Sequence, residues 1–117
     1  MIKDQITLFE DGEEIMTGIA ARETAGHTPG HMALEVRSGS ESVMVLGDSI
    51  GNDHIAFARP SWISGSDQDP ETAAATRTTL MDQLSHEKTR VIGYHLTGNG
   101  IGYVDKMSDG YAFVAEG

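Results

Sequence analysis

The sequence predicts a single α+β domain in which a mainly antiparallel sheet packs against one long helix over about residues 70–87. Short apolar runs separated by turn residues recur along the chain and are typical of strands. Residues 70–87 instead carry their apolar side chains at helical spacing. With 117 residues the chain has the length of one domain, so residues 1–117 are treated as one unit.

The first part of the chain predicts four strands. Residues 6–9 are a short β-type run closed by the turn pair Asp11-Gly12, and residues 15–24 suggest a second strand. Residues 32–36 show partial alternation of apolar and polar side chains, as in a strand with one buried face. After a Ser-Gly-Ser turn, the apolar run within residues 42–46 predicts a strand buried on both faces.

The second part predicts a loop, the long helix and three strands. Residues 49–66 show no period and contain glycine, proline and serine, which indicates a long loop. Asp69 suits the N-cap, Pro70 the first helical position and Glu71 the first turn of a helix that ends near Glu87. Residues 90–94 predict a second buried strand, and residues 101–104 and 111–114 a closing hairpin.

Composition and charge exclude several functional classes. The chain has 8 Lys and Arg against 18 Asp and Glu, a net charge of −10, and no cysteine. The charge disfavours binding to nucleic acid and to anionic membranes, and the absence of cysteine excludes disulfides and thiolate metal sites. No apolar stretch approaches the ~20 residues of a membrane span, and the start of this chain lacks a signal-peptide region, so we expect a cytoplasmic location.

Three side chains are candidate metal ligands because of where they stand. Asp48 and His95 each follow a predicted buried strand, and ligands bind preferentially beyond the carboxyl ends of such strands. His27 lies in a loop with glycine and proline, whose backbone allows close approach to a ligand. Imidazole and carboxylate together suit zinc, manganese, iron or cobalt. Taken singly, each residue also fits a purely structural role in a turn or at a strand end.

Four further residues are candidates for the surroundings of such a site. His31 fits a role behind a ligand, bonded to backbone, at least as well as a role as ligand. His54 either faces the same cavity or lies on the surface of a loop. Phe57 and Trp62 line a substrate pocket or pack under the long loop. No residue is assigned a catalytic role from the sequence alone.

Combined, these pieces resemble a known family. The sequence GHTPGH at residues 26–31, Leu-Gly-Asp at 46–48 and Tyr-His at 94–95 resemble the second half of metallo-β-lactamase-fold hydrolases, in the branch of methyl parathion hydrolase and the lactonases. The resemblance implies the C-terminal half of an αββα sandwich with a dinuclear metal site. It implies that His27 binds the first metal, Asp48 bridges both and His95 binds the second. Hydrolysis of an ester, lactone or phosphoester by a metal-bound hydroxide would follow.

The sequence departs from the family pattern in one respect that bears on activity. The motif His-x-His-x-Asp-His, which supplies most ligands in the family, does not occur before residue 27. Each metal would keep two of these three residues, fewer than the three protein ligands of ordinary catalytic zinc sites. The chain is therefore interpreted as part of a hydrolase site that is incomplete alone. The alternatives are a non-catalytic module that acts by binding a partner, and a small enzyme whose site forms across a dimer.

The resemblance also predicts a partner. Half of a sandwich exposes the sheet face that the other half normally covers, so we expect either a complementary N-terminal half or a homodimer. A small-molecule substrate is expected if the site is active.

Overall fold

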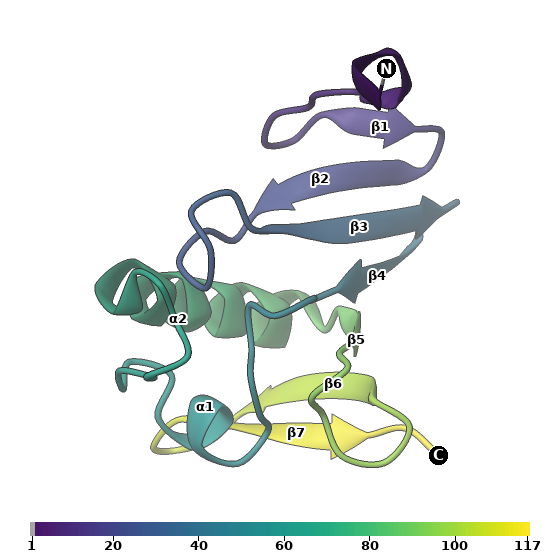
Figure 1. Cartoon of the computed structure of the whole chain (residues 1–117). Helices are drawn as coiled ribbons and strands as arrows, with labels where there is room; N and C mark the ends of the chain where they lie inside the picture. The colour runs from purple at the N-terminus through teal and green to yellow at the C-terminus, as the bar shows by residue number, and fades with distance from the viewer. Residues whose placement is uncertain (1) are drawn as a thin grey trace.

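The computed structural model describes residues 2–117 and shows one sheet with a long helix against it (Figure 1). Within these residues seven strands lie side by side in sequence order, from β1 to β7. The strands are β1 (Glu14–Met16), β2 (Ile19–Glu23), β3 (Met32–Ser38), β4 (Glu41–Val45), β5 (Arg90–Ile92), β6 (Ile101–Lys106) and β7 (Tyr111–Ala115). The helices are a 3-10 turn η1 (Ile2–Gln5), a short α1 (Ile55–Ala58) and the long α2 (Pro70–Glu87). The predicted α+β fold is confirmed.

The connection between β4 and β5 sets the position of the candidate site. These two strands pair in parallel, whereas the other neighbouring pairs are antiparallel. Both α1 and α2 lie in the crossover between them. Because parallel strands end at the same edge of a sheet, the residues that follow β4 and β5 lie close together. Asp48 and His95 are among those residues.

Helix α2 forms where the sequence predicts it and covers one face of the sheet. The Asp69 carboxylate accepts a hydrogen bond from the Thr72 N–H, and Pro70 occupies the first helical position, so both predicted start signals are used. The helix ends at Glu87, as predicted, and its C-cap residue Lys88 has the left-handed conformation. Its buried apolar side chains join those of β4, β5 and β6 in a core that includes Met44, Leu46, Leu80, Met81, Leu84, Val91 and Val104.

Four predictions of secondary-structure elements are wrong. Residues 6–9 form no strand; they pair with no neighbour, and Leu8 is 88% exposed. Residues 15–24 contain two strands instead of one, because Gly18, at φ +83°, reverses the chain between β1 and β2. The loop at residues 49–66 contains α1, whose first two free N–H groups donate to the Asn52 side chain. Strand β5 ends at Ile92, two residues earlier than predicted.

The face of the sheet opposite α2 is only partly covered. Strand register places Val36, Val43, Ile92 and Val114 on this face, which we call the open face. Val36 and Ile92 are each 38% exposed and Val114 is 46% exposed. The prediction that residues 42–46 are buried on both faces is therefore wrong, because only the side towards α2 is packed.

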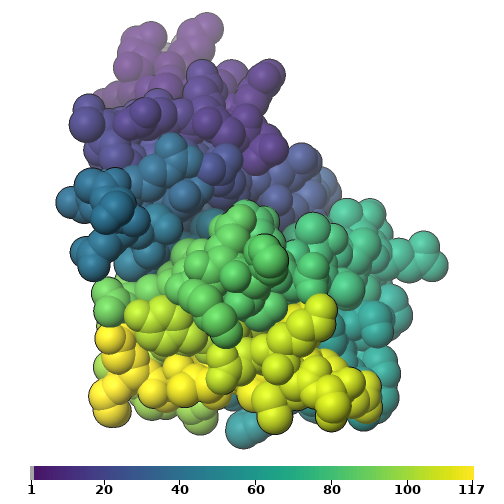
Figure 2. Space-filling view, turned by 180° about the vertical axis from the view of Figure 1, so that it is seen from behind, coloured from purple at the N-terminus to yellow at the C-terminus, as the bar shows by residue number. Residues whose placement is uncertain are grey.

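The N-terminal strands and the C-terminal hairpin lie at opposite ends of the sheet. Figure 2 shows the purple surface of the N-terminal strands at one end of the molecule and the yellow C-terminal hairpin at the other, with the green surface of the α2 region between them.

Among residues 2–117, no helix has the length and apolar character needed to cross a membrane.

Candidate functional site

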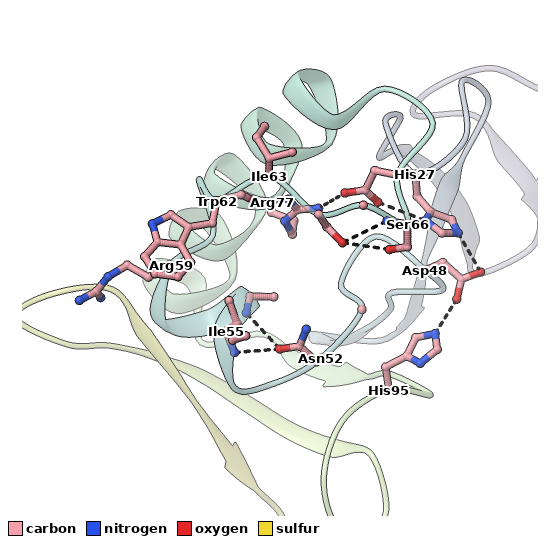
Figure 3. A pocket seen from close by; sticks show the side chains of 15 residues that line it. His27, Asp48, Asn52, Ile55, Arg59, Trp62, Ile63, Ser66, Arg77 and His95 are labelled. Carbon is pink, nitrogen blue, oxygen red and sulfur yellow. Dashed lines mark hydrogen bonds and ion pairs between the residues drawn. The ribbon is translucent and has the colours of Figure 1, made fainter.

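The structure brings the three predicted ligands together around Asp48 (Figure 3). His95 Nε2 lies 2.9 Å from Asp48 Oδ1, and His27 Nε2 lies 3.8 Å from Asp48 Oδ2. Each carboxylate oxygen therefore faces a different histidine. The hydrogen bond from His95 is the largest of the effects that hold the pKa of the Asp48 carboxyl below its usual range, and the nearby His27 adds to it. Asp48 is thus an anion positioned between two imidazoles.

The loop that carries His27 is seated on the N-terminus of α2. Gly26 has φ +136°, and its carbonyl accepts a hydrogen bond from the Asp69 N–H. A Cβ atom at Gly26 would lie 2.3 Å from the backbone of Ala73, so only glycine fits between the loop and the helix. The start of α2 therefore fixes the position of His27 relative to the sheet.

His31 supports Asp48 from behind. Its Nε2 accepts a 2.9 Å hydrogen bond from the Asp48 N–H, and its Nδ1 lies 2.7 Å from Thr24 Oγ1. Because Nε2 accepts, a neutral His31 carries its proton on Nδ1. Burial lowers the pKa of His31, which keeps the ring neutral. Gly47 leaves the room for this contact, since a Cβ there would lie 2.8 Å from Nε2.

Protonation of His31 should make stability depend on pH. Since the pKa of His31 is lowered on folding, the unfolded chain binds the proton more readily. The stabilisation is complete above the ordinary histidine pKa of about 6.5 and is lost as the pH falls from there to the lower pKa of the folded state. Urea unfolding across this pH range measures the loss. The free energy of unfolding should change less with pH in His31→Gln than in the wild type. An equal pH dependence in the two chains would contradict this role.

Two buried charged residues that the sequence interpretation missed stand behind His27. Asp67, in the loop before α2, has a side chain only 4% exposed and forms a 2.7 Å ion pair with Arg77, whose side chain is 5% exposed. The other oxygen of Asp67 lies 3.2 Å from His27 Nδ1. No local pattern marks this contact, because Asp67 and His27 are 40 residues apart in the sequence.

A pocket of about 710 Å³ opens beside the three candidate ligands. Its lining combines His27, Asp48 and His95 with the start of the crossover segment and the loop before α2, including Asn52, Ile55, Arg59, Trp62, Ile63 and Ser66. Ile55, Trp62 and Ile63 are exposed apolar side chains. The pocket thus offers an apolar surface next to an anionic and imidazole-rich edge.

The remaining predicted residues divide between pocket, core and surface. Trp62 lines the pocket, whereas Phe57 is fully buried and packs edge to face against Phe113 at 5.7 Å. Phe57 therefore belongs to the core, and the pocket role considered for it is wrong. His54 has a side chain 82% exposed and does not line the pocket.

The donor types at this site suit zinc, but their number is small. Imidazole nitrogen and carboxylate oxygen are ordinary zinc ligands. Across residues 2–117, however, no three His, Asp or Glu side chains are arranged to hold one ion. His27 with Asp48, and Asp48 with His95, each offer two donors. The residues fit part of the coordination shell of two ions and do not complete either one.

Comparisons with solved structures place the fold. The chain matches AidC, a dizinc quorum-quenching lactonase, with a TM-score of 0.91 and 28% identity over 99% of this chain. It matches AbOPH, a hydrolase of the β-lactamase superfamily, with a TM-score of 0.85 and 27% identity over 91% of this chain. The chain has part of the metallo-β-lactamase fold. A probable metal-dependent hydrolase from Staphylococcus aureus, 18% identical over 97% of this chain with a TM-score of 0.76, shares that fold.

The match covers only part of each metallo-β-lactamase-fold protein. The chain spans 40% of AidC, 37% of AbOPH and 41% of the staphylococcal protein. No family model and no curated protein matches the chain. More than half of each matched structure therefore lies outside the region compared.

Proposed function

We propose that this chain contributes part of a dinuclear zinc site to a hydrolase that cleaves a lactone, ester or phosphoester. The observation that carries the proposal is the position of Asp48, whose two oxygens face His27 and His95 at the edge of a pocket. AidC is a dizinc lactonase and AbOPH a hydrolase, and both match the chain closely in fold. The geometry at Asp48 and the match in fold together favour a metal site of the same type as in AidC.

Each residue has a defined part in this proposal. His27 and Asp48 would hold one zinc ion, and Asp48 and His95 the other, with further ligands supplied from outside this chain. Zinc, when bound, acts as a Lewis acid that polarises the bond to be cleaved and lowers the pKa of water. Ile55, Trp62 and Ile63 offer an apolar wall to the part of the substrate that does not react. His31 holds the backbone of Asp48 in place.

Zinc titration of the purified metal-free chain by calorimetry tests the proposal. We expect binding that is weaker than in sites with three protein ligands, and little hydrolysis by the chain alone. Asp48→Asn should reduce zinc affinity by about tenfold or more, because both ion positions lose a charged ligand. His54→Ala is the matched control, since His54 lies outside the pocket, and it should bind zinc as the wild type does. Absence of zinc binding, or equal binding by Asp48→Asn, would overturn the proposal.

We further propose that the open face is covered by a complementary polypeptide that completes the fold. Most of AidC and AbOPH lies outside the region this chain matches, and the open face exposes Val36, Ile92 and Val114. A second copy is the alternative occupant, but two chains of charge −10 repel each other.

Analytical ultracentrifugation of the same samples tests what covers the open face. The chain alone should self-associate weakly, and more strongly as salt screens its charge. A tight dimer at low salt would make the second copy the occupant. A monomer at all concentrations and salt levels would show that the open face needs no cover. A chain that associates specifically but binds no zinc would be a non-catalytic binding module.

A further inference from the structure

The side chain of Arg77 is held by three acceptors from the loop before α2. Its guanidinium donates to the carbonyl oxygens of Pro60 at 3.2 Å and Trp62 at 2.8 Å, and to Asp67 Oδ2 at 2.7 Å. Arg77 projects from the middle of α2 and is buried. A planar group with three fixed partners has little freedom to move, so Asp67 is held rigidly in turn.

Asp67 uses its two oxygens for two different partners. Oδ2 pairs with Arg77, and Oδ1 lies 3.2 Å from His27 Nδ1. A carboxylate in an ion pair only accepts hydrogen bonds, so the contact with His27 is favourable when Nδ1 carries a proton. A neutral His27 in this tautomer has its lone pair on Nε2.

The lone pair on Nε2 faces the candidate metal position. Nε2 and Asp48 Oδ2 are 3.8 Å apart, which is longer than the 2.7–3.2 Å of ordinary N–H···O hydrogen bonds. In the Nδ1–H tautomer both atoms are electron-pair donors with no proton between them. A cation between the two atoms would be attracted by both. By contrast, His95 Nε2 lies at hydrogen-bond distance from Asp48 Oδ1.

We propose that Asp67, held by Arg77, is a positioning residue that fixes the His27 proton on Nδ1 and directs the Nε2 lone pair towards Asp48. The assignment of the tautomer stands on the geometry of the metal-free chain, whereas its consequence for zinc affinity rests on the proposed function. The same arginine holds the backbone of Trp62, so one buried cation supports both the candidate ligand and the pocket wall.

Nitrogen-15 NMR of the metal-free chain tests the tautomer directly. The histidine rings are labelled with nitrogen-15, and spectra are recorded at a pH above the ordinary histidine pKa. The signals of His27 are identified by their loss in His27→Gln. We expect a protonated Nδ1 and an unprotonated Nε2 in the wild type. In Asp67→Asn the signals of His27 should move towards the tautomer mixture of free histidine. Asp69→Asn is the matched control: Asn is an equally good N-cap, Asp69 contacts Thr72, and the His27 signals should not change.

The outcomes separate this proposal from the proposed function. A wild-type His27 with its proton on Nε2, or unchanged signals in Asp67→Asn, would overturn the positioning role even if zinc binds. The wild-type spectrum decides the question if Asp67→Asn does not fold. With zinc, Asp67→Asn should bind about 10–100-fold more weakly than the wild type. A wild type with the expected tautomer that binds no zinc would overturn the proposed function and leave the role of Asp67 in place.

Discussion

Arg77→Leu should reduce the free energy of unfolding by about 3–5 kcal/mol, because it leaves the buried Asp67 carboxylate without its cation. Both side chains of the pair are at most 5% exposed. The substitution also removes the donors for the carbonyl oxygens of Pro60 and Trp62. Urea unfolding followed by circular dichroism measures the change.

A double variant isolates the buried charge as the cause. Replacing both members of an ion pair by apolar residues avoids an unpaired charge, so Arg77→Leu combined with Asp67→Leu should recover part of the lost stability. Recovery should be incomplete, since the two carbonyl groups remain without their donor. A single variant that costs less than about 1 kcal/mol would show that water reaches the pair and that Arg77 is not the anchor of this loop.

Gly26→Ala should cost about 3 kcal/mol or more of stability and displace the His27 loop. The new Cβ would meet the Ala73 backbone at 2.3 Å, and φ at this position is +136°, where residues other than glycine are strained. Backbone atoms of a helix do not yield as a flexible side chain does. The loop must therefore move away from α2, and this movement would increase the distance between His27 and Asp48.

Gly30→Ala provides the matched control in the same loop. A Cβ at Gly30 would have no neighbour within 4 Å. This variant should change the unfolding free energy by less than about 0.5 kcal/mol and leave the NMR signals of His27 in place. Equal stability of Gly26→Ala and Gly30→Ala would contradict the close packing of the loop on the helix.

Much of the fold is predictable because its signals are local. Asp69 and Pro70 mark the start of α2 through a cap and a fixed φ, both of which depend on adjacent residues alone. The turn at residues 108–110 similarly marks the hairpin of β6 and β7. The run at residues 6–9 has an equally suitable composition but forms no strand. A strand forms only if a neighbouring strand pairs with it, and this pairing depends on the arrangement of the whole sheet.

The candidate site is predictable only in part. Their places in a loop and after two predicted strands mark His27, Asp48 and His95 as candidates, and the parallel pairing of β4 with β5 brings the latter two together. Their roles as ligands remain predictions. Phe57 shows the limit of local patterns, since an aromatic residue in a predicted loop suits a pocket and a core equally well, and only its packing against Phe113 distinguishes the two.

Short segments of the sequence suffice to predict the long helix, the glycine-bearing loop at residues 25–31 and the three candidate ligands, because backbone preference and residue chemistry are local properties. The burial of Asp67 with Arg77 and the contact of this pair with His27 are visible only in the folded chain. The same holds for the face of the sheet that stays open. These features depend on which distant segments come to lie side by side, and that is set by the packing of the entire chain.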